Sequence, residues 1–151
     1  QILEGVVERT VQKSFLVSAD MAHCVHPNYS EVHEEKHMPQ MHKGVVIKTN
    51  ANQRYATTVV GSFLWKEIAR RAGVPTQEFC TRSDMGCGST LGPILASGCG
   101  IRALDVGVPQ LSMHSVREMC GTDDVAHSYA HMHAFYKHFT EVDKMIAVDD
   151  A

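Results

Sequence analysis

The stretch Ser14–Asp20, SFLVSAD, decides how the rest of this 151-residue sequence is interpreted. A short apolar run that ends in a carboxylate is typical of a buried strand whose carboxyl end opens onto a site. Similar runs at Gly44–Thr49 and Ile101–Val106, and a shorter one at Glu78–Arg82, predict three further strands. A single domain accommodates them, because globular domains are commonly about 100–150 residues long.

Three helices are predicted between and after these strands. Thr57–Arg71 has helical periodicity, and a Gly and a Pro follow it. Leu91–Cys99 follows a Gly-rich turn, and a last helix runs from Asp123 to Phe139, with Thr122 or Asp123 as its N-cap. The order of elements predicts an α/β fold, a layered sheet flanked by helices. The apolar side of the first helix is predicted to consist of Val59, Phe63, Leu64, Trp65 and Ile68.

Two long segments show neither a strand nor a helix pattern, and both are interpreted as loops. Met21–Gly44 is rich in His, Pro, Asn and Glu, and Pro109–Thr122 contains His114. Loops of this length in a compact domain are commonly functional. Because Asp20 and Lys48 lie at the carboxyl ends of strands and His114 follows the last strand, we expect a site where the three meet.

The composition excludes several classes of protein. Fourteen basic residues against 17 acidic ones give a net charge of −3, which argues against a polybasic nucleic-acid binder. The sequence contains no run of about 18 apolar residues, so no membrane span is predicted. The N-terminus shows no signal-peptide pattern, and we therefore expect a cytoplasmic protein. The five cysteines lack a C-x-x-C spacing, which favours free thiols in a reducing compartment over a disulfide framework.

Ten histidines raise the question of a metal site. From the residues alone, Asp20 either ligates a metal or caps the next turn, and His114 is either a ligand or a loop residue bonded to backbone. These two donors do not complete a zinc site, which needs three or four ligands. A separate zinc module formed by histidines between His23 and His42 is a weaker alternative, because their spacing is irregular and only Cys24 is nearby.

Other motifs have ordinary interpretations that compete with functional ones. The Gly86–Thr90 turn before a helix resembles an anion-binding nest with a candidate nucleophile at Cys87, but a plain tight turn is favoured. The pair Glu34-Glu35 is interpreted as a solvated face. The remaining histidines are predicted to lie on the surface or at an interface: His127, His131, His133 and His138.

Several blocks of sequence, taken together, resemble the aspartyl aminopeptidases, the M18 family of binuclear zinc peptidases. The resemblance implies a zinc-peptidase-like fold and covers roughly Lys13–Phe139. Residues 1–151 would form the C-terminal portion of a single catalytic domain, without its upstream catalytic half and its inserted oligomerisation domain. In order, the blocks are Ser18–His23 with Val25–Tyr29, His42–Lys48 with Gln53–Thr57, Cys87–Ser97 and Asp105–Glu118.

The resemblance also implies roles for individual residues. Asp20 and His114 would each ligate one of two zinc ions, with other divalent metals as an option. The general base, a Glu, would lie upstream, so no catalytic residue is expected in this chain. Lys48 and His23 would recognise an acidic side chain of the substrate. Three further residues would hold the substrate: Tyr55, Gly88 and Ser89.

The function implied by the resemblance is that of a zinc-dependent aminopeptidase that removes N-terminal Asp or Glu from peptides. The enzyme would be a homo-oligomer, up to a dodecamer, with no nucleic-acid or membrane partner, and the isolated fragment would be inactive. The alternative is a non-catalytic interaction module that keeps the fold without a complete metal site.

Overall fold

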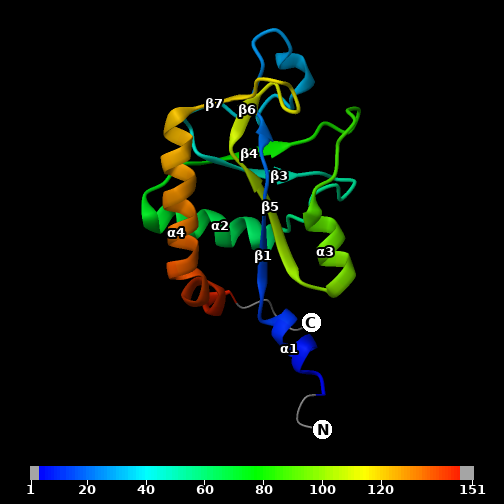
Figure 1. Cartoon of the computed structure of the whole chain (residues 1–151), viewed down its shortest axis with the longest axis vertical. Helices are drawn as coiled ribbons and strands as arrows, with labels where there is room; N and C mark the ends of the chain where they lie inside the picture. Colours follow the sequence, from blue (N-terminus) through cyan, green and yellow to red (C-terminus); the bar gives the residue numbers. More distant parts are fainter. Residues whose placement is uncertain (1–3, 147–151) are drawn as a thin grey trace.

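A computed structural model describes residues 4–146 as a four-stranded sheet covered by helices, with a second, three-stranded sheet at one end (Figure 1). The strands of the main sheet, in spatial order, are β1 (Phe15–Ala19), β5 (Arg102–Gly107), β3 (Val45–Thr49) and β4 (Thr76–Cys80). β1 runs parallel to β5 and β3 runs parallel to β4, whereas β3 and β5 are antiparallel. The layered α/β fold that the sequence predicts is confirmed.

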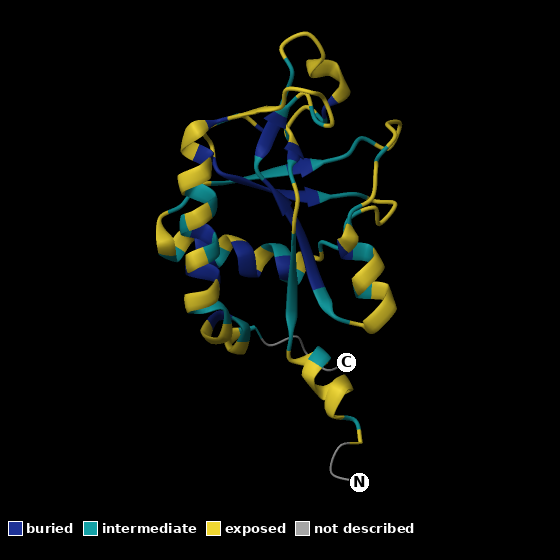
Figure 2. Cartoon of the chain, in the orientation of Figure 1, coloured by how far each residue is buried: buried dark blue, intermediate teal, exposed yellow. Residues whose placement is uncertain are grey.

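The main core lies between one face of this sheet and two helices, α2 (Val59–Ala72) and α4 (Thr122–Met145), which pack against each other. Alternate residues of the strands, such as Val45 and Ile47, point into it because successive side chains of a strand face opposite ways. Figure 2 shows these inner surfaces as buried and the outer faces of both helices as exposed. α1 (Val6–Gln12) precedes β1, and α3 (Leu91–Cys99) packs against β1 and β5.

The local sequence explains where α2 begins and ends. The Thr58 hydroxyl accepts a hydrogen bond from the Gly61 N–H at 3.1 Å, and Gly73 ends the helix with φ 66°. The prediction for its apolar side is wrong at Val59 and Phe63, which are 87% and 57% exposed. These two residues share one helix face, and the buried Leu64 shares a different face with Ile68, because residues four apart are neighbours on a helix.

The two segments interpreted as loops contain short regular elements that the sequence did not predict. β2 (Ala22–His23) and a 3-10 helix, η1 (Ser30–Val32), lie in the first, and β6 (Pro109–Leu111) and β7 (Met119–Cys120) lie in the second. β2, β6 and β7 form the small sheet. Strands of two or three residues leave no periodic pattern, so only their tertiary pairing reveals them.

The start of α4 differs from the prediction. Gly121 occupies the N-cap position, and neither Thr122 nor Asp123 caps the helix. Asp124, buried in the first turn, instead accepts hydrogen bonds from the backbone N–H groups of His42 at 2.6 Å and Gly44 at 2.8 Å. This carboxylate therefore holds the start of the helix against the segment that leads into β3.

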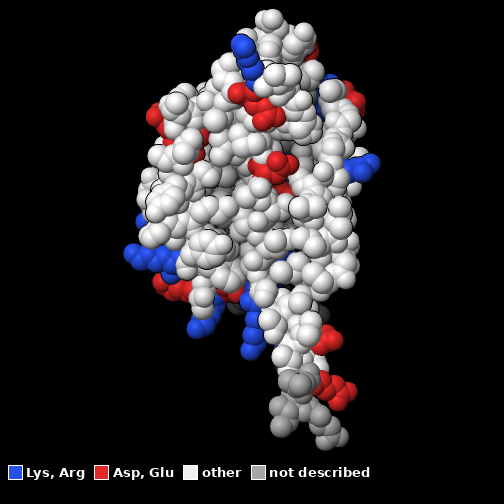
Figure 3. All heavy atoms as spheres, in the orientation of Figure 1, with Lys and Arg blue, Asp and Glu red and all other residues white. Residues whose placement is uncertain are grey.

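The surface features agree with the composition. The face drawn in Figure 3 carries charged side chains of both signs. All five cysteines are free, as predicted. Among residues 4–146, no helix combines the length and the apolar character that a membrane crossing requires.

His131 departs from the prediction that the histidines of the last helix lie on the surface, because it is fully buried. Its ring stacks on the Trp65 indole with a centroid distance of 3.8 Å, and its Nε2 lies 3.1 Å from the Trp65 carbonyl oxygen. Burial lowers the pKa of His131 from 6.5 to about 4. The folded protein therefore keeps this imidazole neutral.

We expect the free energy of unfolding to fall as the pH drops from about 6.5 to about 4, because only the unfolded chain protonates His131 in that window. The full pKa difference corresponds to roughly 3 kcal/mol. Denaturant unfolding of the intact protein at several pH values measures this loss. His131→Phe should flatten the profile, and the control His133→Phe, at an exposed position on the same helix, should not. Equal slopes in all three proteins would refute this role of His131.

Candidate functional site

The chain segments that follow β1 and β5 run side by side beyond the main sheet. Backbone hydrogen bonds continue from Asp20 N to Val106 O at 3.0 Å and from Ala22 N to Val108 O at 2.9 Å, and the pairing passes into β2 and β6. Gly107 allows this close approach, since a Cβ there would lie 1.8 Å from the Asp20 carbonyl oxygen. The ladder brings Asp20 near the loop that carries His114.

A pocket of about 370 Å³ opens where these segments meet. All seven residues that the sequence analysis assigns to the site line it, although they come from five separate parts of the chain. Thr90 and Met113 complete much of the remaining wall. The placement is a finding of the structure, whereas the roles of these residues stay predictions. The seven are Asp20, His23, Lys48, Tyr55, Gly88, Ser89 and His114.

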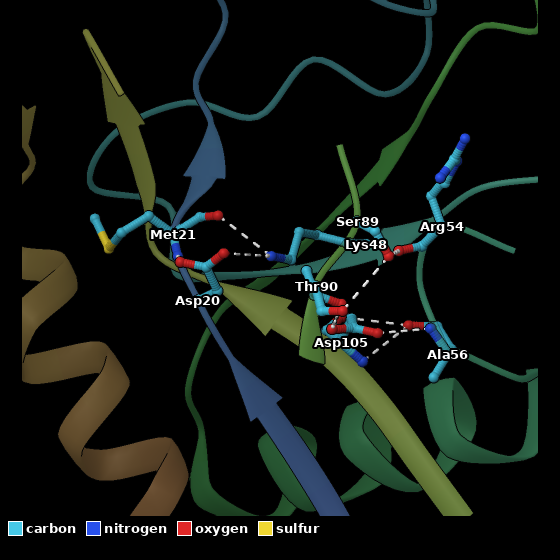
Figure 4. Close-up of polar contacts among 9 residues, drawn as sticks. Asp20, Met21, Lys48, Arg54, Ala56, Ser89, Thr90 and Asp105 are labelled. Atoms are coloured by element: carbon cyan, nitrogen blue, oxygen red, sulfur yellow. Dashed lines mark hydrogen bonds and ion pairs between the residues drawn. The ribbon is translucent and has the colours of Figure 1, made fainter. Parts of the chain in front are cut away.

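Lys48 is the buried cation of this pocket. It is 1% exposed, and its Nζ donates a hydrogen bond to the Met21 carbonyl oxygen at 3.2 Å (Figure 4). The same atom lies 4.0 Å from Asp20 Oδ2 and 5.2 Å from the centroid of the Tyr55 ring. Burial lowers the pKa of Lys48, and the carboxylates of Asp20 and Asp105 oppose that shift.

His23 and Tyr55 contribute polar groups that are uncharged at neutral pH. Burial lowers the pKa of His23 below 6.5, and the neighbouring His33 and Lys48 lower it further. Burial also raises the pKa of the Tyr55 phenol, so the hydroxyl keeps its proton. Beside Lys48, both side chains can therefore donate or accept hydrogen bonds without adding charge.

Asp20 serves partly as a turn residue, because its Oδ1 accepts a hydrogen bond from the Met21 N–H at 2.7 Å. Its side chain is nevertheless 65% exposed, so the carboxylate remains accessible from the pocket. Asp20 can therefore accept this backbone hydrogen bond and bind a metal ion at the same time, since a carboxylate has enough lone pairs for both interactions.

The loop that carries His114 has an unusual backbone. Ser112 and His114 have φ values of 60° and 65°, in the left-handed region that non-glycine residues rarely adopt. The His114 N–H donates a hydrogen bond to Glu118 Oε1 at 2.5 Å, and the Ser115 N–H donates to the Ser112 carbonyl oxygen at 3.0 Å. Such strained residues persist where their surroundings hold them, commonly at functional sites. Glu118 was not predicted as a site residue, although its carboxylate accepts the hydrogen bond from the backbone N–H of His114, the candidate ligand.

The donor set fits zinc in type, since a carboxylate and an imidazole are both common zinc ligands. Within residues 4–146, however, no group of three or more His, Cys, Asp or Glu side chains is arranged to hold a metal ion. The histidines between His23 and His42 therefore do not form a metal site of their own in the described structure. Asp20 and His114 are thus two candidate donors at one pocket.

Asp105 is a further residue that the sequence analysis did not single out. It is fully buried in β5, close to the pocket wall (Figure 4). The sequence contained a signal for it, because after Arg102 a single carboxylate interrupts an apolar strand, and buried carboxylates need partners.

Comparisons with known proteins place the chain in a family. The family model described as aminopeptidase I zinc metalloprotease (M18) matches residues 3–136. A Ricinus communis protein named "Probable aspartyl aminopeptidase" is 62% identical over 144 residues, covering 95% of this chain and 29% of that protein. The aspartyl aminopeptidase of Dictyostelium discoideum is 48% identical over 141 residues, covering 93% of this chain and 29% of that protein.

Solved structures agree with this result. A chain in the cryo-EM structure of the Ape4 and Nbr1 complex superposes with a TM-score of 0.93 at 48% identity, covering 97% of this chain and 28% of its own length. The S. cerevisiae mApe1 dodecamer gives a TM-score of 0.84 at 36% identity, covering 94% and 31%. The chain therefore spans about three-tenths of the length of the relatives that it matches. Because the family model covers most of its residues, this chain belongs to the M18 family of zinc metalloproteases.

Proposed function

We propose that this chain supplies one part of the active site of a zinc-dependent aminopeptidase that removes an acidic residue from the N-terminus of peptides. The observation that carries the proposal is the pocket in which the buried Lys48 cation lies beside Asp20 and His114. A positive charge at the bottom of a pocket favours a negatively charged substrate group. The family supports the peptidase chemistry, and relatives named aspartyl aminopeptidase support the acidic preference.

In this proposal, Lys48 receives the carboxylate of the substrate's first side chain. A hydrogen bond to a charged group contributes about 1.5–3 kcal/mol, enough to prefer Asp or Glu over neutral residues. The Met21 carbonyl and the Tyr55 ring hold the ammonium group in place, so little reorganisation accompanies binding. His23 and Tyr55 offer neutral hydrogen-bonding groups to the same ligand, and Gly88 and Ser89 line the same pocket.

Asp20 and His114 would each hold one of two zinc ions, their oxygen and nitrogen donors lying at the same pocket. Bound zinc polarises a carbonyl group and lowers the pKa of a coordinated water to about 7. The general base and the other ligands would come from another part of the protein, with residues 1–151 as the C-terminal portion of a single catalytic domain. Other divalent metals could occupy the same donors.

The assembly and location of the protein belong to the same proposal. One relative with 36% identity is described as a dodecamer, which supports a homo-oligomer here as well. We expect this oligomer to be cytoplasmic. A second candidate function, a non-catalytic interaction module, is favoured by the limited donor set of the described residues. Zinc analysis of the intact protein separates the two, since a module without a complete site binds no stoichiometric zinc.

We expect Asp20→Ala and His114→Ala in the intact protein to lower kcat on an Asp-peptide by at least about 100-fold, because each removes a metal donor. The measurements are steady-state kinetics and zinc content after dialysis. His133→Ala, an exposed histidine on α4, is the control and should behave as wild type. Wild-type rates in either of the first two variants would contradict its role as a ligand.

Lys48→Met should abolish most of the preference for acidic over neutral N-terminal residues. Methionine keeps much of the buried volume and removes the charge, so the loss should appear mainly as a higher KM for Asp-peptides. We expect the ratio of kcat/KM between Asp- and Ala-peptides to fall about 10- to 100-fold, as loss of a charged hydrogen bond implies. Lys43→Met, at an exposed position nearby, should leave the ratio unchanged. An unaltered ratio in Lys48→Met would remove Lys48 from substrate recognition.

Glu118→Ala should weaken zinc binding about tenfold, because the left-handed backbone at His114 loses the carboxylate that holds its N–H. Competition with a chelator measures the affinity directly, and Glu118→Gln, which keeps an acceptor oxygen, should retain most of it. Wild-type zinc affinity in the alanine variant would show that Glu118 does not position this ligand.

A further inference from the structure

The buried carboxylate of Asp105 joins two walls of the pocket, the segment that carries Tyr55 and the segment that carries Ser89. It lies on β5, where Leu104 and Val106 point into the core, so its side chain points to the opposite face of the sheet. Its Oδ2 accepts a hydrogen bond from the Ala56 N–H at 2.6 Å, and its Oδ1 accepts one from the Thr90 hydroxyl at 2.6 Å (Figure 4). Asp105 itself does not line the pocket.

The two partners belong to the loops that carry the predicted substrate-binding residues. Ala56 follows Tyr55, and Thr90, which itself lines the pocket, follows Ser89, so the two hydrogen bonds fix the two segments that carry wall residues. The walls also touch directly, since the Ser89 hydroxyl lies 3.4 Å from the Arg54 carbonyl oxygen. Asp105 therefore fixes one point of each wall, at Ala56 and at Thr90, and the Ser89–Arg54 contact is a second link between them.

The backbone around Asp105 supports the same arrangement. Its N–H donates to the Thr57 hydroxyl at 3.1 Å, and that hydroxyl lies 3.3 Å from the Asp105 carbonyl oxygen, to which it donates. On the other side, a Cβ at Gly92 would lie 2.3 Å from Asp105 Oδ2. The first turn of α3 can thus rest on the carboxylate only because residue 92 has no side chain.

Two threonines at helix N-caps show that the Thr90 hydroxyl is committed to this carboxylate. Thr58 caps α2 in the usual way, by accepting a hydrogen bond from the Gly61 N–H. Thr90 occupies the same position before α3, but its side chain makes no capping hydrogen bond and bonds to Asp105 instead. Helix α3 therefore lacks a side-chain cap, and the Thr90 hydroxyl instead ties the pocket wall to Asp105.

We propose that Asp105 is a positioning residue that sets the separation of the Tyr55 and Ser89 walls, and through it the preference of the enzyme for acidic N-terminal residues. The inference rests on the proposed function, because it concerns the specificity of that same pocket. Asp105 acts through hydrogen bonds to its neighbours and touches neither substrate nor metal.

The test uses the full-length enzyme and pairs Thr90→Val with Thr58→Val. Both changes replace an N-cap hydroxyl by a methyl group, but only the first breaks a bond to Asp105. We expect Thr90→Val to raise the KM for an Asp-peptide about tenfold with kcat changed less than about threefold, and to lower the Asp/Ala ratio of kcat/KM by a similar factor. Thr58→Val should lower the melting temperature and leave that ratio unchanged.

A second pair of variants distinguishes the effect of the two hydrogen bonds of Asp105 from the effect of its negative charge. Asp105→Asn can still accept from Ala56 and donate to the Thr90 hydroxyl, so its Asp/Ala ratio should stay within about twofold of wild type. Asp105→Ala loses both bonds and should lose the preference as Thr90→Val does, in protein that circular dichroism shows to be folded.

The outcomes discriminate between the inference and the function beneath it. An Asp/Ala ratio equally affected in the two threonine variants, or unaffected in both, would overturn the positioning role of Asp105. An asparagine variant as poor as the alanine variant would also overturn it, because the charge and not the bridge would then matter. A wild-type enzyme with no preference for acidic peptides would instead refute the proposed function.

Discussion

The parallel pairing of β1 with β5 is the constraint on which the rest of the site depends. Its hydrogen bonds continue from Asp20 and Val106 to Ala22 and Val108, past the ends of both strands, and into the small sheet of β2 and β6. Two segments that lie about ninety positions apart in the sequence are thereby held in register. Because Gly107 has no side chain, the two segments can approach closely enough to keep this pairing next to the pocket.

Because side chains alternate along the strands, the main core and the buried charged residues lie on opposite faces of the sheet. On β3, Val45 and Ile47 enter the core beneath α2 and α4, whereas Lys48 faces the other side of the sheet. β5 repeats the arrangement with Leu104 and Asp105. Both charged residues are almost fully buried, which is costly unless polar partners surround them. The face opposite the main core therefore combines these two charged residues and their polar partners with a second apolar cluster of Ala22, Val46 and Phe79.

The sequence predicted the long elements of the fold better than the short ones, and the seven residues that it assigned to a site line one pocket, although their roles stay predictions. The strand at Phe15–Ala19 and the helix at Leu91–Cys99 follow from strong local patterns, and strand ends pointed to Asp20 and Lys48. The short strands of the small sheet escaped notice because they exist only through pairing with distant residues. His131 was misplaced because a histidine on a helix carries no local sign of burial.

The hydrogen bonds of Asp105 fix each of the two pocket loops at one residue and leave the residues beyond that point without a bond to the carboxylate. The carboxylate accepts hydrogen bonds from the Ala56 N–H and the Thr90 hydroxyl and packs against Gly92, and among the described residues it makes no hydrogen bond to those farther along each loop. Those outer residues can therefore vary without disturbing the sheet, provided that the two anchor points remain. Homologues that share this framework could acquire altered substrate ranges through changes confined to the loop tips.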